Sequence, residues 1–361
     1  YIVGIYCHVD LSPWIAGRPV LLYWTIDAEA PVTIIHMGHN RWSVQTAFSG
    51  GHIALDEFTP ERCVEIVRHA VGADVDVEVR SVKPWALTAQ TARSWRRGPV
   101  FLAGDAAHRF PPTGGYGLNT GVQDAHNLAW KLAAVLNGGA GESLLNSYEA
   151  ERSPVAVSNT EFSVRNVMGF AKIMGPGAQM QGQRLAAGEV TLEALSAEIQ
   201  EILDAEAGHF DSPGRELGFC YEDGALEPDG TSLPAVEDPD RDYVPCARPG
   251  ARAPHLWLQR DGERISTLDL YGDAFVLLAG TDQASAWRQA ARGVSPQVDP
   301  VIVGDTVVDV EGNWRELYGV EDGAVLIRPD GHVAWRARHA VDDPGRALQD
   351  VLDRVLCNVP G

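Results

Sequence analysis

The fold is decided by one stretch of sequence, Phe101-Leu-Ala-Gly-Asp-Ala-Ala-His108, which continues as Arg109-Phe-Pro-Pro-Thr-Gly-Gly-Tyr-Gly-Leu-Asn-Thr-Gly121. It places an apolar run, a carboxylate, a glycine loop and the beginning of a helix in direct succession. The apolar run Val100–Ala103 predicts a buried strand. Its carboxyl end would present Asp105 in the crevice where open α/β sheets bind ligands.

The loop that follows is suited to close approach by a ligand. Pro111 and Pro112 fix two φ angles and remove two N–H donors. Gly114, Gly115 and Gly117 have no Cβ that would keep a ligand away from the peptide plane. A flat ring can lie directly on such a backbone.

A helix is predicted after the loop. Thr120-Gly-Val-Gln123 fits the Ser/Thr-x-x-Glu/Gln capping pattern, so the helix should begin near Asn119 or Thr120 and end at Gly138-Gly139. Apolar residues follow at helical spacing: Val122, Ala125, Ala129, Leu132, Ala133 and Leu136. The N-terminus of this helix would direct N–H groups and partial positive charge at the loop, which stabilises negative charge on a ligand. The alternative is a plain strand-to-helix connection whose glycines serve only steric needs.

The composition is that of a globular protein with an acidic surface. The 361 residues are 45% hydrophobic and 22% charged, which allows two or three domains with sizeable cores. A net charge of −20 argues against nucleic acid as a partner, since such binding depends on Lys and Arg clusters. No apolar run is long enough for a membrane span and no signal peptide is visible, so we expect a cytoplasmic protein without a membrane partner.

Neither a metal site nor a redox dithiol is predicted. The cysteines are widely scattered and form no C-x-x-C pair: Cys7, Cys63, Cys220, Cys246 and Cys357. The histidines show no ligand spacing beside cysteines or carboxylates, although His36 and His39 are close in the sequence.

Short connections in the first part of the chain predict a mostly antiparallel sheet. Its strands are expected at Tyr1–Val9, Pro19–Ile26, Val32–His36 and Arg41–Phe48. A helix should begin at Thr59-Pro60 and end at Gly72, and the alternation of Val75, Val77 and Val79 predicts another strand.

This sheet offers weak candidates for a substrate site. Trp42, Val44, Thr46 and Phe48 share one face of their strand, and Arg41, Ser43 and Gln45 share the other. One face should line a pocket, but the alternation does not say which. We take Trp42, Gln45, His36 and Trp85 as candidates, with core packing or an exposed edge as the favoured interpretation of each.

The second half should hold helices, a linker and a separate domain. Residues 142–208 read as helical, and residues 211–254 as a long surface linker. The remaining pattern is strand, strand, helix, strand, hairpin and helix: Ile265–Leu270, Ala274–Ala279, Ala284–Gly293, Val298–Val303, Ala324–Arg328 with His332–Arg336, and Pro344–Leu356. That order looks thioredoxin-like. Because it lacks a cysteine pair, we expect a structural or dimer-forming role rather than a catalytic one.

Several motifs together resemble the second flavin-binding motif of the group A FAD-dependent aromatic hydroxylases, which have the p-hydroxybenzoate hydroxylase fold. They are Gly104-Asp105-Ala106-Ala107-His108, Pro111-Pro112-Thr113-Gly114-Gly115, Gly117-Leu118-Asn119-Thr120-Gly121, Gln123-Asp124-Ala125 and Asn127-Leu128-Ala129-Trp130-Lys131-Leu132. The segment Ser147–Val155 resembles the helix that follows this motif. Arg248–His255 and Ser266–Leu270 resemble the linker and first strand of the extra C-terminal domain in the phenol and chlorophenol hydroxylase branch and in related polyketide hydroxylases.

The resemblance implies an α/β (α+β) architecture with four parts. Residues 1–95 would form a substrate domain on a mixed or antiparallel sheet, and residues 96–210 the second half of the FAD-binding domain. A linker (211–254) and a thioredoxin-like domain without redox cysteines (255–361) would follow. No G-x-G-x-x-G fingerprint occurs in the chain, which opens directly on Tyr1-Ile-Val-Gly. We therefore expect the family's N-terminal nucleotide-binding segment to lie outside this chain and to act as its partner.

The resemblance also implies roles for the loop residues. Gly104 and Asp105 would hold the ribityl chain of FAD, and the N–H groups of Leu118 and Asn119, with Thr120 in the same helix start, would stabilise the flavin N1–C2=O edge. Pro111 and Pro112 would lie beside the ring edge where oxygen reacts, with Gly114, Gly115 and Gly117 allowing the approach. No catalytic residue is matched.

The implied function is an FAD-dependent monooxygenase that uses NADPH or NADH and O2. It would hydroxylate a phenolic or polyketide-derived aromatic ring through a flavin C4a-hydroperoxide. Two alternatives stay open: Baeyer–Villiger oxygen insertion on the same fold, and a flavin-free fragment that serves as a binding or assembly module.

Overall fold

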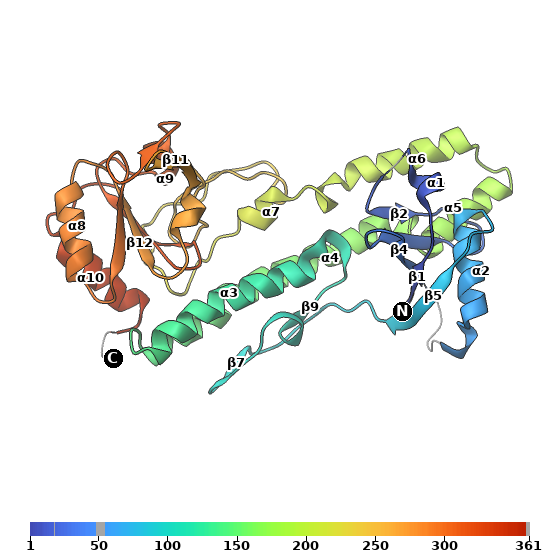
Figure 1. Cartoon of the computed structure of the whole chain (residues 1–361), viewed down its shortest axis with the longest axis horizontal. Helices are drawn as coiled ribbons and strands as arrows, with labels where there is room; N and C mark the ends of the chain where they lie inside the picture. The colour runs from blue at the N-terminus through green and yellow to red at the C-terminus, as the bar shows by residue number, and fades with distance from the viewer. Residues whose placement is uncertain (18, 48–54, 359–361) are drawn as a thin grey trace. The chain divides into compact units, whose positions relative to one another are not determined.

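The computed structural model describes residues 1–17, 19–47 and 55–358 (Figure 1). The chain divides into two compact units. One comprises Tyr1–Gln90, Phe110–Gly114 and Thr160–His209, and the other Thr91–Arg109, Gly115–Asn159 and Phe210–Gly361. Both contain helices and sheets, as the predicted fold class requires.

An antiparallel sheet of five strands forms the first unit, in the order β2-β3-β4-β1-β5. The strands are β1 (Ile2–His8), β2 (Leu22–Trp24), β3 (Val32–His36), β4 (Arg41–Ala47) and β5 (Glu78–Trp85). Every neighbouring pair is antiparallel, which confirms the prediction made from the short connections.

Two of these strands differ from the prediction. Strand β2 is much shorter than Pro19–Ile26, and β5 begins only at Glu78. Val75 precedes β5 because its carbonyl accepts a hydrogen bond from Arg68 Nε (2.9 Å) instead of entering a strand ladder. Phe48 lies outside the described residues.

Helix α2 (Pro60–Val71) covers one face of this sheet. Thr59 caps it by accepting the N–H of Arg62 (3.2 Å), and Gly72 ends it with a φ of 72°, so the predicted bounds are confirmed. The core between helix and sheet contains Cys63, Ile66 and Val67 of α2 and Ile5, Cys7, Trp42 and Val44 of the strands. The other helices of this unit are α1 (Ser12–Ile15), α5 (Pro176–Ala186) and α6 (Leu192–Ala205).

The predicted buried strand Val100–Ala103 is wrong. Strand β8 (Val100–Phe101) has two residues, pairs with β7 (Arg96–Arg97), and leaves Val100 61% exposed. The Leu102 N–H still donates to the Trp95 carbonyl (2.8 Å), in register with β7 and β8, but the Leu102 carbonyl accepts the Tyr148 hydroxyl (2.8 Å) instead of a strand N–H. A 3-10 turn over Gly104–Ala106 follows, and then β9 (His108–Arg109); the two-residue β6 (Gln90–Thr91) comes earlier in the chain.

The helix predicted after the glycine loop exists as α3 (Tyr116–Leu136), but it begins earlier than expected. Gly115, with a φ of 72°, directly precedes it. Thr120 is not a cap, because it lies inside the helix and its hydroxyl accepts from Asn159 Nδ2 (3.0 Å). The predicted end is confirmed by Gly138 (φ 74°) and by the bond from Gly139 N–H to the Ala134 carbonyl (2.8 Å).

Helix α3 carries its polar side inward. The buried residues of its first four turns include Thr120, Asp124, Asn127 and Lys131. The apolar residues that predicted the helix lie largely outside: Val122 and Leu136 are 60% and 81% exposed, Ala125, Ala129 and Ala133 are exposed too, and Leu132 is half-buried. Buried charges require partners, so the inner side of α3 must meet other charged groups.

Helix α4 (Ser147–Gly169) follows α3 after a 3-10 turn over Glu142–Asn146. Residues 147–159 belong to the second unit and the rest to the first. A short helix α7 (Pro213–Leu217) comes later, and residues 218–256 hold only isolated bridges.

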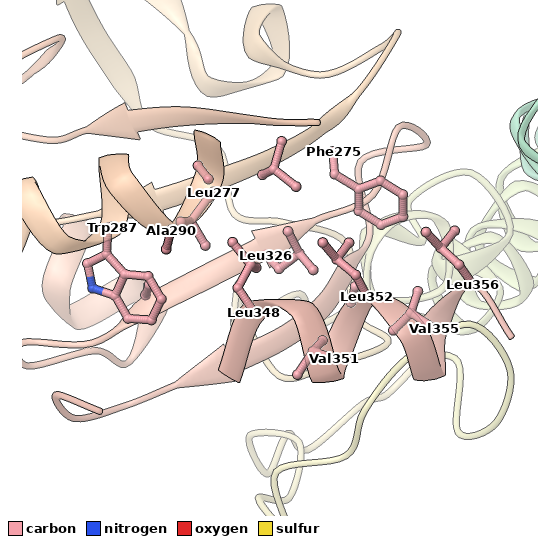
Figure 2. Close-up of a cluster of buried hydrophobic side chains, with 14 of the residues drawn as sticks. Phe275, Leu277, Trp287, Ala290, Leu326, Leu348, Val351, Leu352, Val355 and Leu356 are labelled. Carbon is pink, nitrogen blue, oxygen red and sulfur yellow. The ribbon is translucent and has the colours of Figure 1, made fainter. Parts of the chain in front are cut away.

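The C-terminal part contains a four-stranded sheet in the order β13-β12-β15-β16. Its elements are β12 (Phe275–Ala279), α8 (Ala284–Gly293), β13 (Val298–Ile302), β15 (Ala324–Ile327), β16 (Val333–Ala337) and α10 (Pro344–Val355), all within two residues of the prediction. Figure 2 shows Leu348, Leu352 and Val355 of α10 directed at the sheet residues Phe275 and Leu326.

A second sheet in this part, β11-β10-β14, differs from the prediction. It consists of β10 (Trp257–Arg260), β11 (Glu263–Ser266) and β14 (Val308–Asp309), and α9 (Trp314–Tyr318) follows it. The predicted strand Ile265–Leu270 is wrong beyond Ser266. There the Asp269 carboxylate accepts the Ser266 N–H (2.8 Å), which caps a 3-10 turn over Thr267–Leu270.

Candidate cofactor site

The turn that carries Asp105 lies directly on helix α3. A Cβ on Gly121 would be 3.1 Å from the Cα of Gly104, a separation tighter than ordinary contact. Gly104 itself has a φ of 56°, which favours glycine. Asp105 and Ala106 are exposed at the top of this turn. The backbone of the turn is therefore fixed against α3 at Gly121, and the exposed Asp105 carboxylate is accessible to a ligand.

The first turn of α3 supplies unsatisfied helix donors. Gly114 (φ 81°) and Gly115 (φ 72°) bring the chain into the helix through left-handed backbone, which explains the two glycines. Gly117 and Leu118 lie in the first turn, where an α-helix has no intrahelical acceptor for its N–H groups. Asn119 is the fourth helical residue, and its side-chain amide donates back to the Gly115 carbonyl (2.8 Å).

The segment Pro111–Gly114 belongs to the first unit and is anchored there. Thr113 Oγ1 donates to the Ser163 carbonyl (2.7 Å), and the Gly114 N–H donates to Nε2 of His209 (3.2 Å). Burial lowers the pKa of His209 to about 4, so the ring is neutral at pH 7 and able to accept this bond. Pro111 is buried and Pro112 is exposed.

Asp124 ties both ends of the Asp105 turn to the protein interior. Its Oδ2 accepts the Gly104 N–H (3.1 Å) and His108 Nε2 (2.7 Å), and its Oδ1 accepts Nε of Arg152 (2.9 Å). The three charged or ring side chains are fully buried. Burial alone would raise the pKa of Asp124, but the His108 hydrogen bond and the Arg152 charge outweigh it and lower that pKa.

A second buried ion cluster lies about two helical turns further along α3, at Lys131. Glu151 of α4 accepts from Lys131 Nζ (2.8 Å) and from both terminal nitrogens of Arg328 (2.9 and 2.8 Å). Arg328 also bonds Asp330, which accepts Nε1 of Trp130 (3.0 Å). Burial lowers the pKa of Lys131 to about 8 despite Glu151, whereas Arg328 and Lys131 overcome burial and lower the pKa of Glu151 to about 2.

The substrate candidates lie on two different faces of the sheet. Trp42 is 1% exposed in the core under α2 and donates from Nε1 to the Val9 carbonyl (3.1 Å). His36 stacks on it at a ring distance of 4.3 Å. Gln45 and Trp85 are on the opposite face. They pair with Gly4 and Ile2 of β1, which alternate along that strand with its core residues.

The described residues contain neither a side-chain group suited to a metal ion nor a helix able to cross a membrane. No group of three or more His, Cys, Asp or Glu side chains in the described part of the chain has the geometry of a metal site. No helix over the same residues has the length and apolar content needed to cross a membrane.

The sequence did not single out the residues that anchor this site. The quoted motifs contained four of them, Asp124, Arg152, Glu151 and Lys131. The only sign of their role was that each is a charged residue in a helix, and the structure shows that all four face inward. Arg328 and His209 carried no local signal for their contacts with Glu151 and Gly114, which are 177 and 95 residues away in the sequence.

Two family models match the chain. Residues 1–163 match the FAD binding domain, and residues 247–358 match the C-terminal domain of the aromatic-ring hydroxylases. The chain thus carries sequence of both domains, on a fold of the p-hydroxybenzoate hydroxylase type. The first matched range includes the Asp105 turn and helix α3, and the second includes the sheet of β12, β13, β15 and β16.

Among curated relatives, tetracenomycin A2 monooxygenase-dioxygenase of Streptomyces glaucescens is 39% identical over 342 residues, which is 92% of this chain and 55% of the relative. A 4-methyl-5-nitrocatechol 5-monooxygenase of a Burkholderia species is 43% identical, over 83% of this chain and 52% of the relative. The chain spans little more than half the length of these two relatives.

Two solved structures are similar over 99% of the chain. The flavin-dependent monooxygenase PieE, in complex with FAD and substrate, is 35% identical with a TM-score of 0.87, and 66% of it is covered. A ternary complex of aklavinone-11 hydroxylase with FAD and aklavinone is 34% identical with a TM-score of 0.79, and 62% of it is covered.

Proposed function

We propose that this chain supplies the ribityl and isoalloxazine part of an FAD site in a monooxygenase that hydroxylates a phenolic or polyketide-derived aromatic ring. The observation that carries the proposal is the exposed Asp105, fixed on α3 by the contact of Gly104 with Gly121. A carboxylate at one end and helix donors at the other suit a ligand with hydroxyl groups followed by an electron-rich ring. The FAD domain match over residues 1–163 supports the same ligand.

Each loop residue has a role in this proposal. Bound FAD supplies oxygen activation, with electrons from NADPH or NADH. Asp105 accepts hydrogen bonds from the ribityl hydroxyls beside Gly104. The first turn of α3, with Gly117, Leu118, Asn119 and Thr120, stabilises negative charge at the flavin N1–C2=O edge through its backbone.

The remaining loop residues shape the ring's surroundings. Pro111 and Pro112 exclude water beside the ring, and Gly114 and Gly115 let the backbone pass close to it. The aromatic substrate contacts the sheet face that carries Gln45 and Trp85, since α2 covers the opposite face with Trp42 and His36.

We also infer the larger organisation from the resemblance. Residues 1–95, 96–210, 211–254 and 255–361 act as substrate domain, flavin domain, linker and a thioredoxin-like domain without a cysteine pair. A nucleotide-binding segment of the family type completes the adenosine side of the site. The protein works in the cytoplasm, and its thioredoxin-like domain contributes to a homodimer.

Flavin titration tests this proposal. FAD is added to the purified chain, first alone and then with the part of the Streptomyces glaucescens relative that lies outside the match, and the flavin absorbance bands are followed. Saturable binding with a spectral shift is expected in at least one condition. No binding in either would favour the alternative of a flavin-free binding module.

Product analysis then separates the two reactions. With NADPH or NADH, candidate phenols should gain one oxygen on the ring, detected by mass spectrometry. Conversion of cyclic ketones to lactones, without ring hydroxylation, would instead assign Baeyer–Villiger insertion.

A further inference from the structure

Helix α4 presents two adjacent charged residues to two different partners. Glu151 is 1% exposed and Arg152 is fully buried. Consecutive residues on an α-helix point about 100° apart, so the two side chains leave the helix in different directions. Whatever fixes one of them also fixes the orientation of the other.

Arg152 contacts helix α3 and is linked to the turn that carries Asp105 through Asp124. Its Nε donates to Asp124, the carboxylate that accepts the Gly104 N–H and His108. Its Nη2 donates to the Thr120 carbonyl (3.3 Å) and to Gln123 Oε1 (3.1 Å). Asp124 therefore joins the turn to α3 through two bonds, and Arg152 fixes Asp124 and the neighbouring part of α3 to helix α4 through three.

Glu151 reaches the C-terminal domain, defined here as residues 247–358. Its two oxygens receive both terminal nitrogens of Arg328, which follows strand β15. Asp330, in the same hairpin turn, neutralises the remaining charge of that guanidinium. The hairpin turn is thus attached to α4 by a buried bidentate pair, the geometry in which arginine differs most from lysine.

Tyr221 lies between the two groups. Its hydroxyl accepts from Arg152 Nη1 (3.3 Å), and its ring is 5.4 Å from the guanidinium carbon of Arg328 and 4.5 Å from the His332 ring. The two ion clusters therefore share α4 on one side and this ring on the other.

We propose that Arg328 of the C-terminal domain is a positioning residue for the Asp105 turn, acting through Glu151 and Arg152 of helix α4. The C-terminal domain then helps to set the geometry of the flavin site without contacting it. The expected effect on flavin binding rests on the proposed function. The coupling between Arg328 and the Asp105 turn can be measured without flavin.

The first test measures hydrogen exchange of the amides in residues 102–109 on the purified chain. Arg328→Met should speed their exchange about tenfold, because it leaves Glu151 and Asp330 buried with Lys131 as the remaining cation. If that variant does not fold, Arg328→Lys keeps the charge, loses the bidentate geometry and should give a smaller increase.

Leu326→Ala is the matched control. Leu326 is fully buried on β15, the strand that Arg328 follows, and lies in the apolar core with Leu348 and Leu352. Its apolar side chain can form neither a hydrogen bond nor an ion pair with Glu151. It should lower the melting temperature without changing exchange in residues 102–109. Equal acceleration by Leu326→Ala, or none by either Arg328 variant, would overturn the proposal.

The second test asks whether the link passes through Arg152. Arg152→Met should accelerate exchange as Arg328→Met does, and Arg152→Lys should restore part of the protection because it retains the charge beside Asp124. The double variant Arg328→Met with Arg152→Met should be no faster than the faster single variant. Multiplied effects would mean that the two residues act independently.

Flavin binding gives the final readout. In the condition in which the wild type binds FAD, Arg328→Lys should raise the Kd and shift the bound flavin's absorbance bands, while Leu326→Ala should leave both unchanged. If the wild type binds no FAD, the flavin proposal fails. The exchange results then still decide whether Arg328 positions the turn.

Discussion

Gly104 and Gly121 touch backbone to backbone, with 3.1 Å between the Gly104 Cα and the place a Gly121 Cβ would take. Gly121→Ala gains about 1 kcal/mol of helix propensity, but forcing the methyl into this contact costs about 1–3 kcal/mol. We expect a net loss of about 1 kcal/mol in the free energy of unfolding, measured by urea denaturation. Gly117→Ala is the control: no atom lies within 4 Å of its Cβ position, so it should raise stability.

Asp105→Ala should weaken FAD binding and leave the fold unchanged. The residue is exposed, and among the described residues its hydrogen bond is the one that its backbone carbonyl accepts from Arg109 Nε (3.4 Å). Flavin titration should show a Kd at least about tenfold higher, in line with the loss of a charge-assisted hydrogen bond of about 1.5–3 kcal/mol. Unchanged affinity would contradict the placement of the ribityl chain. Circular dichroism and melting should match the wild type.

The free energy of unfolding should decrease as the pH is lowered, because of His209. Its folded pKa of about 4 lies below its ordinary value of 6.5, so the unfolded chain binds the proton first as the pH falls. The stabilisation is complete above pH 6.5 and is lost progressively toward pH 4, by about 3 kcal/mol at 1.36 kcal/mol per pKa unit. His209→Gln keeps an acceptor for Gly114 without titrating. Its urea midpoint should therefore decline less between pH 7.5 and 5 than that of the wild type.

Replacing Lys131 and replacing Arg328 should lower the free energy of unfolding by very different amounts. Burial lowers the pKa of Lys131 to about 8, so its partners do not repay its desolvation in full. Lys131→Met leaves Glu151 paired with Arg328 and should cost no more than about 1 kcal/mol. Arg328→Met strands two carboxylates beside one lysine and should cost about 3–5 kcal/mol. Equal losses in chemical denaturation would contradict this division.

The two sheet faces can be told apart by stability. Trp42→Phe removes a buried hydrogen bond to Val9 and part of a core side chain, so it should lower the free energy of unfolding by about 1–3 kcal/mol. Gln45→Ala on the opposite face should stay within about 0.5 kcal/mol of the wild type. Substrate affinity should instead change more in Gln45→Ala than in Trp42→Phe. A larger loss of affinity in Trp42→Phe would place the substrate on the face under α2 and contradict the proposal.

The elements that were predicted well are those whose signals are local. Thr59 and Gly72 bound α2 through their own hydroxyl and backbone, and strands such as Val32–His36 alternate as expected. The capping pattern at Thr120 failed because a distant side chain, Asn159, takes its hydroxyl. The strand at Val100 failed for the same kind of reason, since Tyr148 takes the Leu102 carbonyl.

The local features of the loop were predictable from the sequence, and the residues that support the loop were not. Proline, glycine and Asp105 mark the loop in the sequence, because backbone shape and an exposed charge are local properties. The faces of α3 were not predictable, since apolar residues outside and charges inside reverse the ordinary pattern. That reversal becomes intelligible only when Arg152 and Glu151 are seen opposite the helix.

The ion cluster around Glu151 also bears on how this chain can be recombined with its relatives. A chimera that takes its C-terminal domain from a relative would naturally be joined in the irregular stretch 218–256, where few elements are cut. Such a junction separates Arg328 and Asp330 from Glu151, Lys131 and Trp130, which lie on the other side of it. The compatible unit of exchange is therefore this set of five side chains, and a graft should succeed when donor and recipient agree at those positions.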